Sequence, residues 1–182
     1  MRLNVPDGYL DFDLDLFWDV AGPLNAKIQE ILAIDDPEMR LLYEETIEQL
    51  LGVALASAQV YIAAVSRYHG VAKDKTIGLG PTHTSGRTIA SLVNHGANFW
   101  KHADEWNWDA LDDRAKRIVS ACRDLDAIYS DTNDPRSDIS LVRFVSSLTG
   151  SNSADLQSLR HLLEQWRTSI EQAFPDRLHG AT

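Results

Sequence analysis

Cysteine is nearly absent from this sequence of 182 residues, which contains only Cys122. A single cysteine cannot form an internal disulfide, so we expect a reducing, cytoplasmic setting. Cys122 lies in a stripe of apolar residues at helical spacing, which predicts a small buried side chain. This thiol is therefore a poor candidate for a nucleophile.

Long hydrophobic segments are also missing. The first residues, MRLNVPDGY, lack the apolar core of a signal peptide. The most apolar stretch, residues 50–65, is interrupted by Ser57, Gln59 and Tyr61 and is short for a membrane span. We therefore expect a soluble protein that has no membrane partner.

Positive charge is scarce, because 17 lysines and arginines face 27 aspartates and glutamates and the net charge is −10. This balance does not favour broad, non-specific binding to nucleic acid, which needs a basic surface. It leaves room for a local groove lined by Arg, Lys and His, or for a partner that supplies the positive charge.

Strand-like alternation stands out in one stretch, residues 10–17 (LDFDLDLF). We interpret it as the entry to a helix, because a single strand would have nothing to pair with. Elsewhere apolar residues recur at helical spacing. The sequence therefore predicts an all-α protein, a bundle of five to seven helices with one long central helix. We expect a single domain over residues 1–182, with loose ends at 1–8 and 175–182.

The long central helix is predicted to start at Asp36 and Pro37 and to end at Gly70. It would contain about 33 residues and measure about 50 Å. Its second half is apolar or small on nearly every side, as expected for a helix buried in a bundle. Small side chains would allow close helix approach, so we expect part of this surface to meet a second copy of the chain in a homodimer. These residues are Gly52, Ala56, Ala58, Ala63 and Ala64.

Capping residues and helix breakers delimit the other predicted helices. Pro23 fits the first turn of one helix, and Thr84 or Ser85 can cap another. Further helices are predicted at residues 23–34, 85–106 and 110–130, with a loop at 71–83. Ser137 or Asp138 is predicted to open a short helix that ends near Gly150, and Asn152 or Ser153 to open the last helix, which ends near Phe174.

The segment of residues 85–108, SGRTIASLVNHGANFWKHADEWNW, predicts an amphipathic helix with an unusual polar side. A solvated helix face usually carries Lys, Glu, Gln and Arg. This face instead carries His, Asn and Ser, which form directional hydrogen bonds, and His also transfers protons or binds metals. The polar stripe consists of Arg87, Ser91, Asn94, His95, Asn98 and His102.

Two kinds of chemistry are conceivable on this stripe. A metal site would use His95 and His102, but their seven-residue spacing puts the ring-bearing carbons about 10 Å apart, too far for one ion without further ligands. We therefore expect no metal or other cofactor, and keep a metal-binding bundle as the least favoured alternative. Acid–base chemistry on a phosphodiester needs a proton-transferring His, a polar group and a cation, which His102, Asn98 and Lys101 offer within about one turn.

Residues 97–102, ANFWKH, resemble the motif helix of the HEPN superfamily (higher eukaryotes and prokaryotes nucleotide-binding domains). The motif of that family is an arginine, a polar residue that is often Asn, a few further residues and a histidine. Asn98 and His102 match the polar residue and the histidine. Ala97 occupies the arginine position, and Arg87 lies too far upstream to replace that arginine by spacing.

The resemblance implies a helical bundle that dimerises with its motif helices facing each other in a cleft. Many HEPN domains are metal-independent ribonucleases of toxin–antitoxin or phage-defence systems, and others lack the active residues and bind partners. On this basis His102 would be the general acid or base, Asn98 would orient it or the phosphate, and Lys101 or Arg87 would offset the phosphate charge. The partner would be RNA or a cognate protein.

A non-catalytic function is the alternative to a ribonuclease. The missing motif arginine and the acidic charge both favour a non-catalytic helical interaction or regulatory protein. The aromatic residues Trp100, Trp106 and Trp108 are expected to pack the core and the helix end, with base stacking as the alternative.

Overall fold

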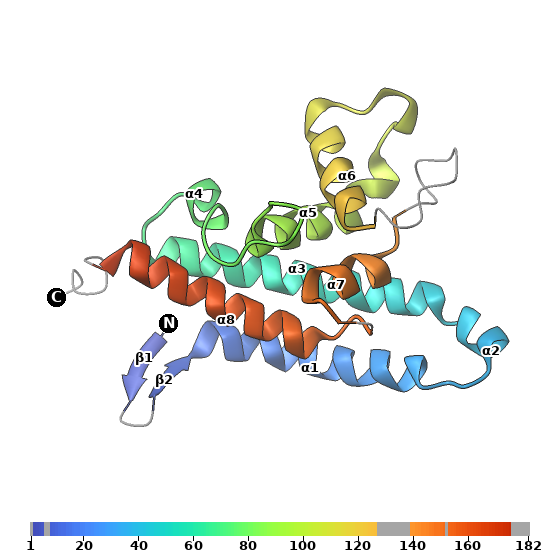
Figure 1. The fold of residues 1–182 in the computed structure, drawn as a ribbon, viewed down its shortest axis with the longest axis horizontal. Coiled ribbons are helices and arrows are strands. Elements are labelled where there is room, and N and C mark those ends of the chain that lie inside the picture. The colour runs from blue at the N-terminus through green and yellow to red at the C-terminus, as the bar shows by residue number, and fades with distance from the viewer. Residues whose placement is uncertain (1, 6–7, 127–138, 152, 176–182) are drawn as a thin grey trace.

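The computed structural model describes residues 2–5, 8–126, 139–151 and 153–175 (Figure 1). Within these residues the fold is an all-α bundle with a small β-hairpin, which confirms the predicted fold class. The hairpin strands are β1 (Arg2–Val5) and β2 (Gly8–Asp11). The helices are α1 (Phe12–Leu32), α2 (Pro37–Leu41), α3 (Glu44–Tyr68), α4 (Lys73–Ile77), α5 (Ile89–His102), α6 (Asp113–Asp126), α7 (Leu141–Thr149) and α8 (Leu156–Ala173), with 3-10 turns η1 (Ala103–Glu105) and η2 (Trp108–Ala110).

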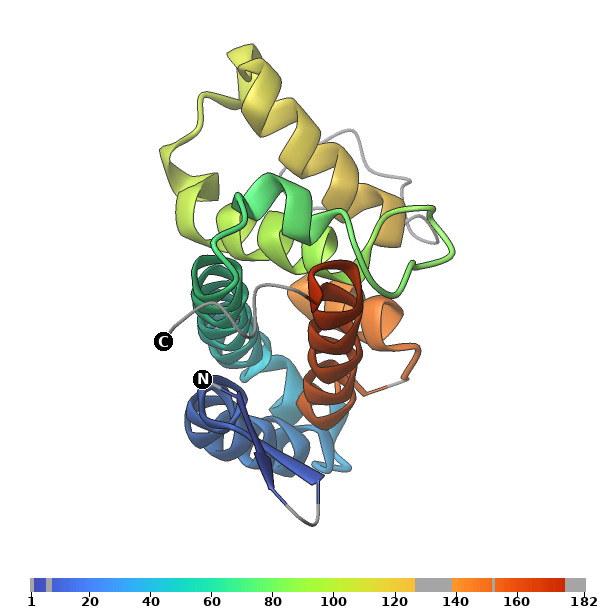
Figure 2. The ribbon, with the colours of Figure 1, turned by 90° about the vertical axis from the view of Figure 1, so that its left-hand side faces the viewer.

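The predicted long central helix is present as α3, which packs against α1, α5, α7 and α8. It runs antiparallel to α1 and in the same direction as α8 (Figure 1). In the view turned by 90°, α5 lies above α3 and α6 lies beyond α5 (Figure 2). Helix α6 packs against α5 and α7. Six of the described helices have nine or more residues, as predicted, whereas α2 and α4 are five-residue helices that were not predicted.

The start of the long helix was predicted wrongly, because the chain turns at Leu42 and Tyr43 and separates α2 from α3. Asp36 caps α2 as predicted, since its side chain accepts hydrogen bonds from the amides of Glu38 and Met39. No residue of α2 is buried. The short helix therefore gains little from packing, and tertiary packing is what normally sustains a long helix.

The start of the chain was predicted to be a loose end at residues 1–8, but residues 2–5 and 8–11 form two strands. Strands β1 and β2 form an antiparallel hairpin in which Arg2 lies opposite Asp11. The predicted helix entry at residues 10–17 is therefore half right, because its first two residues end β2 and the rest form the first turns of α1. Asp11 makes this switch, since its Oδ1 accepts a hydrogen bond from the amide of Leu14 at 3.2 Å.

The first helix also differs from the prediction, because α1 continues through Pro23 instead of beginning a new helix there. A proline inside a helix removes one backbone hydrogen bond. Here the ring is exposed, while Ala21 and Ile28 on either side of it are buried in the core. Packing on the core side therefore holds the two halves of α1 together.

Helix α5 is shorter at both ends than predicted. Its cap is Thr88 rather than Thr84 or Ser85, and the Thr88 side chain accepts a hydrogen bond from the amide of Ser91. The helix ends at His102, where the 3-10 turn η1 begins, rather than at Trp106. As a consequence, Arg87 precedes the helix and does not lie on its polar side.

The last three helices follow the predicted order with shifted ends. Helix α6 begins at Asp113, three residues later than predicted, and residues 127–130 of its predicted end lie outside the described residues, as do Ser137 and Asp138, the predicted caps of α7. Ser140 caps α7, and Gly150 ends it in the left-handed conformation with φ 65°, as the predicted stop requires. Asp155 caps α8, whose predicted start was Ser153. Residues 176–182 also lie outside the description.

A buried ion cluster ties α1, α3 and α8 together. Asp11 accepts a hydrogen bond from the Tyr61 hydroxyl at 2.9 Å and lies 3.8 Å from Nη1 of the buried Arg167. Arg167 Nε donates to Glu171 at 3.0 Å. Burial, together with the Asp11 carboxylate, raises the pKa of Tyr61 far above its ordinary value, so the phenol stays protonated and donates.

Gly52 permits the close approach of α3 and α5, and its replacement is a direct test of this contact. A Cβ atom at position 52 would lie 2.2 Å from Cδ1 of Trp100, whose Nε1 donates to Gln49 at 3.2 Å. We expect Gly52→Ala to lower the free energy of unfolding by about 1–3 kcal/mol, because the indole ring must move. Urea denaturation measures this change. Ser57→Ala, on the same helix, is the control, and equal midpoints for the two variants would contradict the contact.

Candidate functional site

Helix α5 presents its polar side to a groove formed with α3, α4 and α6. Its other side is buried. Gly96 on that side lets Phe144 of α7 pack closely against α5, since a Cβ atom at position 96 would lie 2.6 Å from Cε1 of Phe144. The groove has a volume of about 550 Å³. It is lined by Gln59, Val60 and Ala63 of α3, Lys73, Asp74 and Ile77 of α4, Asn94 and Asn98 of α5, and Arg114 of α6.

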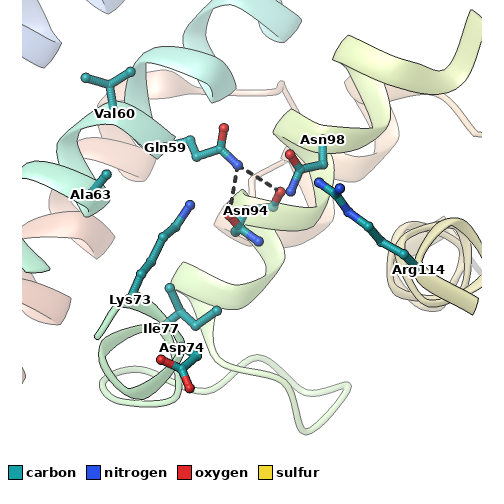
Figure 3. Close-up of a pocket in the computed structure, with 9 residues that line it drawn as sticks. All are labelled: Gln59, Val60, Ala63, Lys73, Asp74, Ile77, Asn94, Asn98 and Arg114. Carbon is teal, nitrogen blue, oxygen red and sulfur yellow. Dashed lines mark hydrogen bonds between the residues drawn. The ribbon is translucent and has the colours of Figure 1, made fainter. Parts of the chain in front are cut away.

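Three amide side chains line the middle of this groove, which we call the amide groove, and a cation lies on either side (Figure 3). Lys73 and Arg114 both extend toward the amides, Arg114 toward Asn98 in particular (Figure 3). No ion pair of Lys73 or Arg114 is found among the residues that the structure describes. The groove, which the carboxylate of Asp74 also lines, therefore combines amide donors with two cations that have no ion pair in the described part of the chain, and this combination suits an anion.

Hydrogen bonds fix part of this arrangement. Gln59 Nε2 donates to Oδ1 of Asn94 at 2.8 Å, and Lys101 Nζ donates to Oε1 of Gln59. The side-chain amide of Asn98, by contrast, has no hydrogen bond to any part of the chain that the structure describes. Asn98 is therefore the amide best placed to bind a ligand in the groove.

The electrostatics of Lys73 agree with this interpretation. Burial of the ammonium group, and then the like charge of Lys101, lower the pKa of Lys73 below its ordinary value. A lysine pKa falls in this way when the cation lacks a compensating anion. An anion in the amide groove would relieve this destabilisation.

A second, smaller pocket of about 250 Å³ contains the predicted acid–base residue His102. Its Nδ1 lies 3.0 Å from Oε2 of Glu105, and 38% of the His102 side chain is exposed. Trp106 and Asp112 line the same pocket, and so does Arg114. Arg114 thus lines both the amide groove and the His102 pocket and connects Asn98 with His102.

Arg87 and Lys101, the other predicted catalytic residues, line neither the amide groove nor the His102 pocket. The guanidinium of Arg87 binds Asp124 of α6, with Nη2 and Oδ2 3.0 Å apart, and lines neither pocket. Arg87 was predicted to offset the phosphate charge beside Asn98 and His102, and its position outside both pockets gives this prediction no support. Lys101 is exposed and reaches the groove only through Gln59.

His95 is turned toward its own helix. Its Nδ1 donates to the carbonyl oxygen of Ser91 at 2.7 Å. Burial lowers the pKa of His95 and, although this hydrogen bond opposes the shift, the positive charges of Arg87 and Arg117 add to it, so the ring is neutral at physiological pH. Among the described residues there is no cluster of three or more His, Cys, Asp or Glu side chains that could hold a metal ion.

The departure from the HEPN-like motif has a structural explanation. Ala97 is completely buried, so a side chain at this position points into the core and an arginine there could not reach the groove without rearrangement. The arginine that does line the groove is Arg114 of α6, which lies outside residues 97–102 in the sequence. Arg114, Lys73 and Gln59 were not predicted as site residues, because they come from three other helices.

The aromatic residues pack as predicted. Trp106 and Trp108 contact Phe99 in edge-to-face geometry, with ring centroids 6.0 and 6.5 Å away, and Trp100 packs against the core. Cys122 is buried, as expected, and burial raises its thiol pKa far above the ordinary value. One of these rings, Trp106, also lines the His102 pocket.

Among the described helices α3 alone is long and apolar enough to cross a membrane by length and composition, although half of its most apolar window is buried inside the bundle. Core helices of soluble proteins commonly have this property. In comparisons with known proteins, no family model, no curated protein and no solved structure matches the chain.

Proposed function

We propose that the protein is a HEPN-like, metal-independent ribonuclease of the kind found in toxin–antitoxin or phage-defence systems, and that it acts in the cytoplasm. One observation carries this proposal. Arg114 lines both the pocket of Asn98 and the pocket of His102, two pockets that adjoin at this residue, which would bring an amide, an arginine and an imidazole to one phosphodiester. Metal-independent RNA cleavage needs these three kinds of group.

His102 is suited to proton transfer by the way it is held. Glu105 binds Nδ1 and would stabilise the positively charged ring, which leaves Nε2 to exchange a proton with the substrate. In the reaction, the RNA 2′-hydroxyl oxygen attacks the adjacent phosphorus while His102 removes its proton. The P–O5′ bond breaks, the leaving O5′ takes up the proton that His102 removed, and the products are a 2′,3′-cyclic phosphate and a 5′-hydroxyl end.

The cations of the amide groove would bind the phosphate. Arg114 can donate two parallel hydrogen bonds to the non-bridging oxygens, and Asn98 can donate a third. Lys73 lies further along the groove and would contact a neighbouring phosphate of the same strand. This local concentration of positive charge allows an acidic protein to bind RNA without a basic surface.

A cleavage assay with an Arg114 variant tests the proposal. We expect the wild type to cleave single-stranded RNA in the presence of EDTA, and Arg114→Gln to lower kcat/KM by about 10²–10³-fold, because a phosphate cation is lost while the amide can still hydrogen-bond. Arg117→Gln is the matched control on α6, since Arg117 is exposed and, within the described residues, its Nε donates to the backbone carbonyl oxygen of Asp113. Equal activity of Arg114→Gln and the wild type would contradict the assignment.

A non-catalytic module that binds a cognate protein is the second candidate. The net charge of −10 favours it, as do two carboxylates, Glu105 and Asp112, that line the His102 pocket and would repel a phosphate. A purified protein that leaves RNA intact and whose expression slows growth neither as wild type nor as Asn98→Ala would support this candidate over the ribonuclease.

A further inference from the structure

The outward side of α3 is an apolar surface without a partner in the described chain. Residues 49–66 contain no charged side chain, although this helix forms part of the protein surface. Val53 is 39% exposed and Val60 is 67% exposed. Figure 2 shows the reason, since α1 lies below α3 and α5 above it, and no described helix covers the remaining side. We call the surface formed by Val53, Ala56, Ser57, Val60 and Ala64 the α3 stripe.

The α3 stripe has the spacing of a helix that packs against another helix. Val53 and Val60 are seven residues apart and therefore project from the same side after two turns. The small residues Ala56 and Ser57 lie between them and let an opposing helix approach closely. A surface of this kind is more readily covered by another helix than by water.

The two exposed valines lie at equal distances from the midpoint between Ala56 and Ser57. If a two-fold axis passes through this midpoint, a second α3 runs antiparallel to the first. Val53 then lies opposite Val60 of the partner subunit, and Gln49 lies opposite Ala64 of the partner subunit. Each valine meets a valine, and both copies contribute the same surface, as a two-fold interface requires.

Charges at the two ends of the helix match the same register. The exposed Arg67 near the C-terminal end would lie beside the partner's Glu45, and each pair would occur twice. Within the described residues neither Arg67 nor Glu45 has an ion pair of its own. A parallel arrangement would instead place like charges side by side, because the acidic residues gather in the first turn and Arg67 in the last.

We propose that the α3 stripe is the interface of a homodimer in which two copies of α3 pack antiparallel about a two-fold axis between Ala56 and Ser57. The interface adjoins the functional site, because Val60 and Ala63 also line the amide groove. A two-fold axis perpendicular to both helices keeps equivalent sides of the helices on the same face, so both amide grooves open on one face of the dimer. This last step rests on the proposed function, and it makes the dimer a binding surface for two adjacent segments of one RNA.

Site-directed cross-linking tests the register of the helices. The native thiol, Cys122, is buried, so an introduced cysteine is the main reactive site. A short bismaleimide should link Ser57→Cys to itself efficiently, because both copies lie at the two-fold axis. Val53→Cys and Val60→Cys should link poorly when alone and efficiently when mixed. Lys116→Cys on α6 is exposed and should not link. Equal linkage of all four variants, or none for Ser57→Cys, would overturn the proposed register.

Light scattering without RNA tests the dimer itself and is independent of any ribonuclease activity. We expect a dimer for the wild type and a rise in dissociation constant of at least about tenfold for Val60→Glu, because its charge would be buried against the partner. Arg67→Glu should weaken the dimer, and Glu45→Arg combined with Arg67→Glu should restore it. A wild type that is monomeric over a wide concentration range would overturn the proposal, and flotation of that monomer with lipid vesicles would assign the stripe to a membrane.

Discussion

Replacing His102 with alanine should lower the rate of RNA cleavage by about 10²–10⁴-fold, the usual contribution of a general acid or base. The imidazole is the group in the two adjoining pockets best suited to proton transfer, and Glu105 holds its Nδ1 at 3.0 Å. The loss should appear mainly in kcat, because Arg114 and Asn98 still bind the phosphate.

The chain contains a matched control for this experiment. His161 and Glu164 of α8 form the same three-residue pairing, with Nδ1 3.6 Å from the carboxylate, and line neither pocket. His161→Ala should therefore leave cleavage unchanged, whereas Glu105→Gln should lower it less than His102→Ala. If His102→Ala and His161→Ala cleave RNA equally fast, His102 takes no part in the reaction.

Replacing Trp166 with alanine should lower the free energy of unfolding by about 3–5 kcal/mol, which is the cost of removing a large aromatic side chain from a core. Trp166 is completely buried in α8 and contacts Tyr61 of α3 edge to face, with ring centroids 6.0 Å apart. Its Nε1 donates to the carbonyl oxygen of Thr76 in α4 at 3.0 Å. The substitution would leave a cavity where three helices meet and would remove the hydrogen bond from α8 to α4, although the Thr76 carbonyl oxygen would still accept from the amide of Leu79 at 3.1 Å.

Chemical denaturation of two further variants separates these contributions. Trp166→Phe keeps most of the ring volume and loses only the hydrogen bond, so it should fall between the wild type and the alanine variant. Trp106→Ala removes a partly buried ring and should cost less than Trp166→Ala. A change below about 1 kcal/mol for Trp166→Ala would mean that the contacts of α8 with α3 and α4 contribute little to stability.

Local patterns in the sequence predicted the bundle well, because they depend on neighbours a few residues apart. The apolar spacing around Cys122 indicated a buried helix side, and Gly150 marked the end of α7 correctly. Helix starts were less certain, because several capping residues compete. Thr84, Ser85 and Thr88 can each cap a helix by type, and Thr88 prevails where its hydroxyl also donates to the carbonyl oxygen of Ile77.

The candidate site was only half visible in the sequence for a related reason. Asn98 and His102 lie on one helix, so their shared face followed from helical geometry. Arg114 and Lys73 reach the groove from α6 and α4, and nothing in their local sequence distinguishes them from other surface cations. Their role depends on how three helices dock against α5, which is a tertiary property.

The division of the site between α5 and α6 has a consequence for control. Asn98 and His102 stay on α5, but Arg114 reaches them only while α6 is docked by its buried apolar side, which includes Ile118 and Cys122. A partner protein that lifted α6 away from α5 would remove Arg114 from both pockets without binding to Asn98 or His102. An inhibitor of the proposed ribonuclease therefore need not resemble a nucleic acid, since a wedge between α5 and α6 would be enough.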